Sequence, residues 1–347
     1  MINLIKGEFK KNLKKGSIIT LSIIYIALII VTAVAFNVLK ELSDSIGGDL
    51  DGNISVNESH EGRIYKEEEI DSLIAETKDE IELMKEQMKK DKHYDSELKY
   101  AQSKLKAYEY IKSNKLFGSR VSIVGIDRDI TEGLTAEKLV DLFVKFGGGV
   151  AIIYAIILGA RLFADEYKSG TIKMLMSRPL KRSKITGAKM IMLLSTVAFF
   201  VFVPTLIIYL YGLIAYPADG ATKVLTVFNG TSAYTTTVGA LVFGEIMEVF
   251  LEAAILGLIS FCLGTLTRKP SLGLIISLVV FVGGGLVTSL LGIAAFTLSN
   301  AFEFMNFFTV SASVPIKGNF FISLTIMAVW TAAAIATTFL VVDKRDV

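Results

Sequence analysis

Long uncharged runs of apolar residues are the feature that most limits how this chain can fold. A helix needs about 20 mostly apolar residues to cross the hydrocarbon core of a bilayer. The chain is 52% hydrophobic, and the excess over a soluble domain gathers into such runs. The sequence therefore predicts an all-α membrane protein with six transmembrane helices. The predicted spans are residues 18–36, 147–160, 190–216, 250–267, 271–296 and 319–342.

The distribution of Lys and Arg sets the expected orientation, because short cytoplasmic loops carry an excess of both. Several lysines precede the first apolar run. With six crossings, the basic connections 161–189 and 268–269 fall on the same side of the membrane as this basic head. The connections on the other side, 217–237 and 297–318, contain one lysine each. We therefore expect both termini in the cytoplasm.

This topology divides the chain into three regions. Residues 1–37 form a cytoplasmic amphipathic lead-in and the first span, and residues 38–140 form a polar extracellular insert. Residues 141–347 form the membrane domain with the second to sixth spans. A long loop crosses the membrane largely regardless of its charge, so the many lysines of the insert agree with this arrangement.

The extracellular insert contains apolar side chains at alternating spacings of three and four residues, interrupted at 89–96. Such spacing places these side chains on one face of a helix. The pattern predicts two amphipathic helices folded as an antiparallel hairpin at about residues 64–115. Two interpretations stay open: a solvated structural arm, or a surface for a peptide substrate or an extracellular partner. The spaced side chains are Ile70, Ile74, Thr77, Ile81, Met84 and Met88, then Leu98, Ala101, Leu105 and Tyr108.

Glu245, Glu248 and Glu252 form the one cluster of ionisable residues beside a predicted span. Spacings of three and four residues put all three on one helical stripe. A carboxylate inside the membrane costs about 2.5–3.5 kcal/mol on insertion scales, so it normally faces protein or water. The stripe is therefore either a cation or proton path, or part of a helix that begins above the membrane.

The sequence offers little that would support an enzyme. It has no P-loop motif for ATP phosphates and no recognisable hydrolase motif. The single Cys262 and the separated His60 and His93 form no metal-binding or redox pattern. A net charge of +2 does not point to nucleic acid. We therefore expect no catalytic residue, no cofactor or metal bound by this chain, and no nucleic-acid partner.

The polar stretch between the second and third predicted spans is the most distinctive part of the chain. Asp165 and Glu166 lie near its start, where a helix dipole favours anions, and Arg178 follows its last turn, where cations are favoured. Pro179 ends this turn. The residues predict a short helix at the cytoplasmic face of the membrane, at 163–178.

The stretch contains a series of residues at the spacing F..E...GT...L...P..R......K: Phe163, Glu166, Gly170, Thr171, Leu175, Pro179, Arg182 and Lys189. This series resembles a motif of the ABC-2-type permease subunits of bacterial ABC exporters. The basic amphipathic opening and the closing VVDKRDV are also similar to the ends of that family. The large first loop is similar to the branch with a large extracellular loop between spans 1 and 2.

The resemblance implies a non-catalytic permease subunit in a bacterial cytoplasmic membrane, working in an exporter. Residues 163–178 would be its coupling helix, docked on a separate ATPase subunit that binds Mg-ATP. A second permease copy or a paralogue and membrane lipid would complete the partners. The implied contact or hinge residues are Phe163, Glu166, Gly170, Thr171, Leu175, Pro179 and Arg182.

Two other functions stay open beside the permease. The extracellular hairpin fits a membrane sensor or scaffold that binds a ligand or a partner protein. The Glu245, Glu248 and Glu252 stripe fits an ion-coupled secondary transporter, although the chain shows no obvious inverted repeat.

Overall fold

A computed structural model gives the fold of the chain. It describes residues 2–14, 17–47, 63–88, 95–117, 120–123, 135–176, 180–216, 222, 224–228, 233–291, 298–302 and 320–344. The helices are α1 (Ile2–Lys14), α2 (Ser17–Gly47), α3 (Glu67–Met88), α4 (Asp95–Ser113), α5 (Ala136–Lys168), α6 (Ile172–Met176), α7 (Arg182–Ala215), α8 (Val238–Thr267), α9 (Pro270–Leu291), α10 (Leu298–Phe302) and α11 (Phe320–Lys344).

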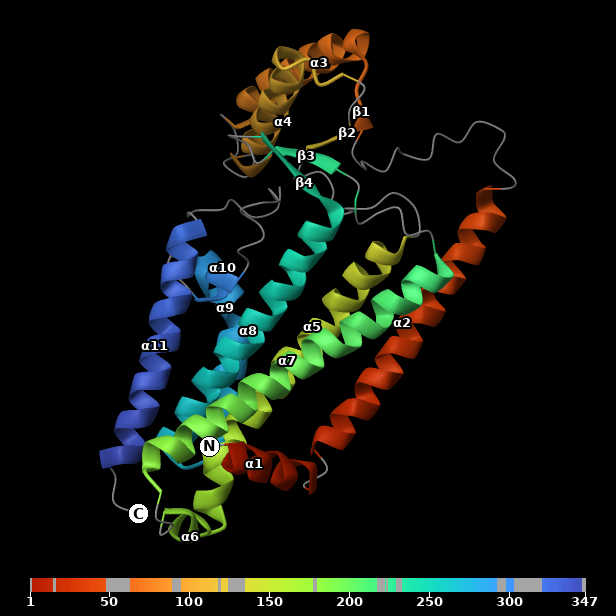
Figure 1. The fold of residues 1–347 in the computed structure, drawn as a ribbon. Helices are drawn as coiled ribbons and strands as arrows, with labels where there is room; N and C mark the ends of the chain where they lie inside the picture. Colours follow the sequence, from red (N-terminus) through yellow and green to blue (C-terminus); the bar gives the residue numbers. More distant parts are fainter. Residues whose placement is uncertain are drawn as a thin grey trace.

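The described residues contain five helices long and apolar enough to cross a membrane: α2, α5, α7, α8 and α11. They lie side by side as a bundle of tilted helices (Figure 1). The prediction of a mainly helical membrane protein is thus confirmed. α9 begins at Pro270, where the predicted segment 271–296 begins, and runs to Leu291. Only its part Pro270–Phe281 is described together with its side chains, and that part alone is shorter than a span. A sixth span therefore stays a prediction.

Two of the membrane helices extend well beyond the apolar runs that predicted them. α5 has 33 residues and α8 has 30, whereas the predicted spans were 147–160 and 250–267. Each begins with a threonine N-cap: the hydroxyl of Thr135 accepts from Lys138 N, and that of Thr237 from Ala240 N. Hydropathy marks the part of a helix that suits lipid, but capping residues decide where the helix begins.

α5 and α8 form the centre of the bundle because small residues let their backbones approach closely. A Cβ atom added at Gly159 would lie 2.2 Å from the carbonyl oxygen of Gly257, and one at Gly264 would lie 2.5 Å from that of Ala160. Larger side chains at these positions would push the helices apart. Because this contact prevents α5 and α8 from sliding along each other, it also sets the position of the loop that follows α5.

The bundle has two different ends (Figure 1). One end carries α1, α6 and both termini, with α1 lying across the ends of the longer helices; we call it the α6 end. The other end carries α3, α4 and the strands; we call it the sheet end.

α3 and α4 occupy the region of the predicted hairpin and pack against each other. Their contact is made by two small apolar clusters that bury many of the side chains singled out by their spacing. Ile70 is fully buried, and Thr77 lies on the same buried face. The first cluster contains Tyr65, Ile70, Ala107, Tyr108 and Ile111, and the second Ile81, Leu98 and Ala101.

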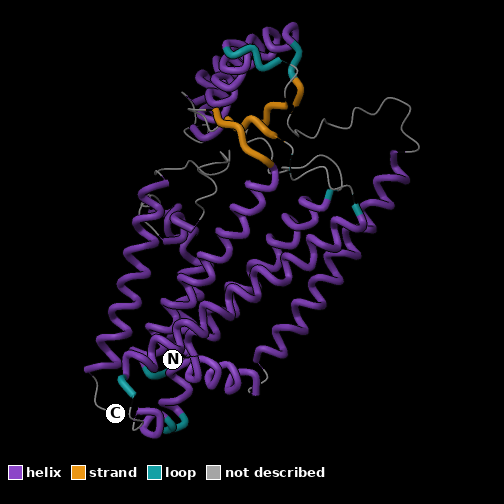
Figure 2. The backbone as a smooth tube through the Cα atoms, viewed as in Figure 1, coloured by secondary structure: helices purple, strands orange, loops and turns teal. Residues whose placement is uncertain are grey.

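A four-stranded sheet, absent from our all-α prediction, joins this hairpin to the bundle (Figure 2). Its strands are β1 (Arg63–Ile64), β2 (Arg120–Ile123), β3 (Val224–Phe228) and β4 (Ala233–Thr237), in that spatial order. β2 and β3 are parallel, and the two outer pairs are antiparallel. Because β2 and β3 are about a hundred residues apart, their pairing leaves little trace in the local sequence pattern.

Candidate functional site

Three elements meet at the α6 end of the bundle: the N-terminal helix α1, the last turns of α5 and the first turns of α7. Lys189 of α7 lies between them. Its Nζ is 3.1 Å from Glu8 Oε2 and 2.9 Å from Glu166 Oε1, and it donates to the carbonyl oxygen of Leu162 at 3.1 Å. Lys11 of α1 also pairs with Glu166 Oε1. We call Glu8, Lys11, Glu166 and Lys189 the ion cluster.

The centre of the ion cluster is closed to solvent, whereas Lys11 lies at its edge with 42% of its side chain exposed. Lys189 is 0% exposed and Glu166 is 3% exposed. A lysine ammonium has three protons to donate, and the three oxygen acceptors satisfy all of them. The ring of Phe163 adds a cation–π contact with its centroid 5.1 Å from Nζ. A buried charge is tolerated only when it is paired in this way.

Helical spacing explains why these residues converge. Glu8 and Lys11 are three residues apart on α1, and Leu162 and Glu166 are four apart on α5, so each pair shares one face of its helix. Lys189 lies on the buried face of α7 that packs against both. Two acidic side chains thus meet two basic ones, with Lys11 at the solvent-exposed edge of the cluster.

The loop after α5 differs from the single helix predicted at 163–178. Residues 163–168 are the last turns of α5, which ends at Lys168. Ser169 caps it, and its hydroxyl donates to the carbonyl oxygen of Asp165 at 2.8 Å. Gly170 follows with φ +70°, the left-handed conformation that closes many helices. A five-residue helix, α6, comes next. Glycine stops the longer helix because its backbone reverses the chain direction there.

The predicted contact residues divide into buried and exposed groups. Phe163 and Glu166 are buried, and Gly170 and Thr171 are exposed in the turn. Leu175 lies in α6, and Pro179 lies outside the described residues.

Arg182, the last of the motif residues singled out as a contact, caps another helix. Its Nη1 donates to the carbonyl oxygens of Val342, at 3.3 Å, and Asp343, at 3.4 Å, at the end of α11. The last carbonyls of a helix have no partner within the helix. Arg182 therefore ties the C-terminal end of α11 to the start of α7.

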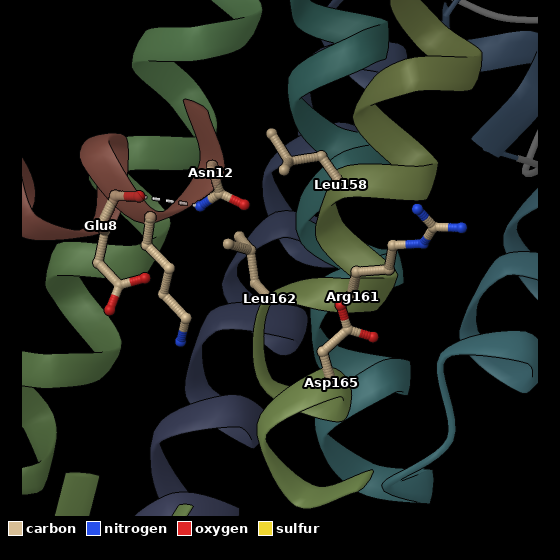
Figure 3. A pocket seen from close by; sticks show the side chains of 7 residues that line it. Glu8, Asn12, Leu158, Arg161, Leu162 and Asp165 are labelled. Carbon is tan, nitrogen blue, oxygen red and sulfur yellow. Dashed lines mark hydrogen bonds between the residues drawn. The ribbon is translucent and has the colours of Figure 1, made fainter. Parts of the chain in front are cut away.

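A pocket of about 210 Å³ separates α1 from α5 beside the ion cluster. Figure 3 shows Glu8 and Asn12 on one side, with Leu158 and Leu162 of α5 extending toward them. The Asn12 amide donates to the Glu8 carbonyl oxygen at 3.1 Å. α1 is therefore joined to α5 across a partly open space, through charged side chains. The pocket is lined by Glu8, Lys11, Asn12, Leu158, Arg161, Leu162 and Asp165.

The carboxylate stripe on α8 lies nearer the sheet end and is half-buried. Glu245 interacts with the side chains of Asp141 and Lys145 on α5, and Lys145 pairs with Asp141 at 2.6 Å. Glu137, one turn earlier on α5, is buried with neither carboxylate oxygen bonded among the described residues. Within that part of the chain, no group of three or more His, Cys, Asp or Glu side chains is placed to hold a metal ion.

Several residues of these two groups escaped sequence reasoning. Glu8 and Lys11 read as parts of a basic opening, and Lys189 as the last letter of a motif. Two features of the sequence could have indicated them. Glu8 is an acidic residue among lysines, and Lys189 is a single lysine at the edge of an apolar run. Glu137 and Asp141 were missed because the predicted span began after them.

The fold and the site together define a multi-pass membrane protein. In it, buried ion pairs join the N-terminal helix α1 to α7 and to the end of α5, where the short loop begins. The family model of the ABC-2 family transporter proteins matches residues 2–347, so the chain belongs to that family. It is therefore the membrane component, a transmembrane permease, of an ABC transporter of the plasma membrane. No match was found among the curated proteins.

Proposed function

We propose that the chain is the permease subunit of an ABC exporter and receives energy from a separate ATPase subunit. The observation that carries this proposal is the loop 169–176, which is exposed at its tip and anchored at its base by the ion cluster. The sequence has no P-loop motif, so Mg-ATP binds the partner and this chain forms the translocation pathway.

The proposed topology has six spans, with the α6 end in the cytoplasm and the α3–α4 hairpin outside. Lys6, Lys10 and Lys11 of α1 lie at the α6 end with Lys168 and Lys173 of the loop. Short cytoplasmic segments carry this excess of basic residues. The proposal places both chain termini on the side where an ATPase has access to ATP.

The ATPase docks on the turn and on α6. Gly170, Thr171 and Lys173 are exposed, and Met174 is 75% exposed, while Ile172 is buried and holds the loop down. An exposed thioether adapts readily to an apolar groove of a partner. Phe163, Glu166 and Arg182 then act by positioning the loop, and Leu175 and Pro179 are further contact or hinge residues.

Two permease chains, identical or paralogous, pair with two ATPases. α2 and α11 expose apolar side chains along their lengths, including Ile23, Val31, Val329 and Trp330. Such faces suit lipid or a second membrane helix. We assign these two helices to the outer surface of each permease, around the central pair α5 and α8.

The carboxylates of α8 line the translocation path in this proposal. Glu245 meets Asp141 and Lys145 inside the bundle, and ionisable groups at such depth normally face protein or water. Glu245→Gln is expected to lower transport while leaving ATPase binding unchanged. Equal transport by Glu245→Gln and the wild-type chain would remove this stripe from the path.

The docking proposal is tested with the ATPase subunit that co-purifies with the tagged chain from its native membrane. Met174→Asp is expected to weaken ATPase binding about tenfold, because a charge replaces an apolar contact. Leu83→Asp is the matched control, since Leu83 of α3 is a similarly exposed apolar side chain at the sheet end. Unchanged binding by Met174→Asp would show that α6 is not the docking element.

A further inference from the structure

α1 packs against the bundle with two buried polar side chains beside the partly buried Phe9. Glu8 and Asn12, one turn apart, are each 8% exposed, whereas Lys6 and Lys10 face outward. An amphipathic helix normally buries its apolar face. The Asn12 amide reaches Met192 Sδ of α7 at 3.8 Å. Hydrogen bonds and ion pairs thus act together with the packing of Phe9 to position α1 on the bundle.

These polar bonds converge on one ammonium group. Lys189 Nζ binds Glu8 of α1 on one side, and Glu166 and the Leu162 carbonyl of α5 on the other. Glu166 lies three residues before Ser169, where the loop turns. A displacement of the loop therefore acts on Glu166. It reaches α1 through Lys189 and Glu8, and also through the direct pair of Glu166 with Lys11.

Charged side chains, and not close packing, join α5 to α1 beside the ion cluster. The pocket of about 210 Å³ separates α1 from α5 along Leu158 and Leu162, so close packing does not join them there. Glu166 Oε2 is buried with no hydrogen-bond partner among the described residues. Both ion pairs of Glu166, with Lys11 and with Lys189, are made by Oε1.

α1 also leads directly into the first membrane helix. Residues 15 and 16 alone separate it from α2. The hydroxyl of Tyr25 in α2 donates to the Gly147 carbonyl oxygen of α5 at 3.0 Å, inside the membrane part of the bundle. A movement of α1 is thus passed to a helix that contacts the central helix pair.

We propose that Lys189 is a positioning residue for energy coupling, which holds α1 and the docking loop together as one unit. The ATPase moves the loop, Lys189 carries that movement to α1 through Glu8, and α1 passes it to α2. This inference rests on the proposed permease function and adds α1 to the elements that respond to the ATPase.

The test compares two readouts in vesicles that contain the tagged chain and its co-purified ATPase. One is the amount of ATPase bound, and the other is the ATP hydrolysed per bound ATPase. Glu8→Gln and Lys189→Met are each expected to keep binding within about twofold and to lower hydrolysis about tenfold, because removing one partner disrupts a buried pair. Lys189→Arg keeps the charge and is expected to restore most of the hydrolysis.

The double variant Glu8→Gln/Lys189→Met separates coupling from general damage. If both residues act through one bond, the double variant loses about as much hydrolysis as one single variant, and not the product of both losses. Lys184→Met, an exposed lysine earlier on α7, is the matched control and is expected to match the wild-type chain. Independent, multiplying losses would overturn the proposal.

Folding is followed by the thermal unfolding of each variant in detergent. If Lys189→Met fails to fold, Glu8→Gln and Lys189→Arg still test the proposal. Glu8 lies on the peripheral helix α1, and Lys189→Arg keeps the buried charge. Wild-type hydrolysis per bound ATPase in Glu8→Gln overturns the positioning role. A wild-type chain that neither binds nor stimulates an ATPase overturns the permease proposal itself, so the two failures are distinguishable.

Discussion

The two ends of the bundle are held together by different kinds of interaction. At the α6 end, side-chain charges from three elements meet in a buried cluster around Lys189. At the sheet end, the hairpin has its own small apolar clusters and is joined to the bundle through strands paired by their backbones. Backbone pairing tolerates most side chains, whereas a buried charge depends on each partner.

The same contrast holds for the ion pairs themselves. Those of the hairpin lie on its surface: Lys78 and Glu109 are 3.5 Å apart with about half of each side chain exposed. Water and salt screen such pairs. The α6 end is therefore expected to respond strongly to single charge changes, and the sheet end to respond weakly.

The largest expected effect breaks the ion cluster at its centre. Glu166→Ala removes the carboxylate shared by Lys11 and Lys189, and we expect the free energy of unfolding to fall by about 3–5 kcal/mol, since a buried lysine loses its partner. Chemical unfolding in detergent micelles measures it. Asp71→Ala, which removes the exposed partner of Lys112, is the control, with an expected loss below about 1 kcal/mol. Equal losses would contradict the comparison.

A second substitution tests whether the hairpin is stabilised by its own core. Ile70 is fully buried among Tyr108 and Ile111, so Ile70→Ala is expected to lower local stability by about 2–5 kcal/mol. Hydrogen exchange should accelerate in α3 and α4 while α5 and α8 stay protected. Leu83→Ala, at an exposed position of α3, should leave exchange unchanged. Faster exchange throughout α8 would show that hairpin and bundle unfold together.

A smaller effect is expected where Arg182 caps α11. Arg182→Met removes hydrogen bonds to two carbonyl oxygens, and we expect a loss of about 1 kcal/mol. Amide exchange in the last turn of α11 reports it. The neighbouring Lys181 is exposed, so Lys181→Met is the control. An unaltered α11 in Arg182→Met would mean that the cap contributes nothing.

The smallest effect is expected at the surface of the hairpin. Lys78→Met removes the pair with Glu109, and the change in unfolding free energy should lie within about 1 kcal/mol. It should shrink further at high salt, because exposed charges are screened. Unfolding at low and high salt measures both values. A loss as large as that of Glu166→Ala would remove the distinction between the two ends.

Sequence reasoning reached the features that repeat over short distances. Apolar runs indicated the membrane helices, and the spacing around Ile70 and Ile81 indicated the hairpin, because both follow from the local geometry of a helix. The sheet was missed since β2 and β3 are distant along the chain. The turn at Gly170 was missed because the residues of 163–178 are equally compatible with one continuous helix and with two helical segments separated by a turn.

Only part of the candidate site could be predicted from the sequence. The motif from Phe163 to Lys189 was visible as a resemblance, but its side chains read as one contact surface. In the structure, Glu166 is buried and Met174 is exposed, although the two residues are close to each other in the sequence. Burial in this stretch depends on which helices pack around it, and the order of residues from Phe163 to Lys189 does not contain that information.

The sequence by itself determined that the chain is a helical membrane protein with a basic end and a polar insert, because helix formation and lipid solubility depend on neighbouring residues. Only the tertiary structure decided which charges meet. Glu8 and Lys189 are 181 residues apart, and their pairing depends on the packing of α1 and α7. A charge buried by that packing is stable only when its partner lies opposite it, so the buried charges at the α6 end determine which helices pack together there.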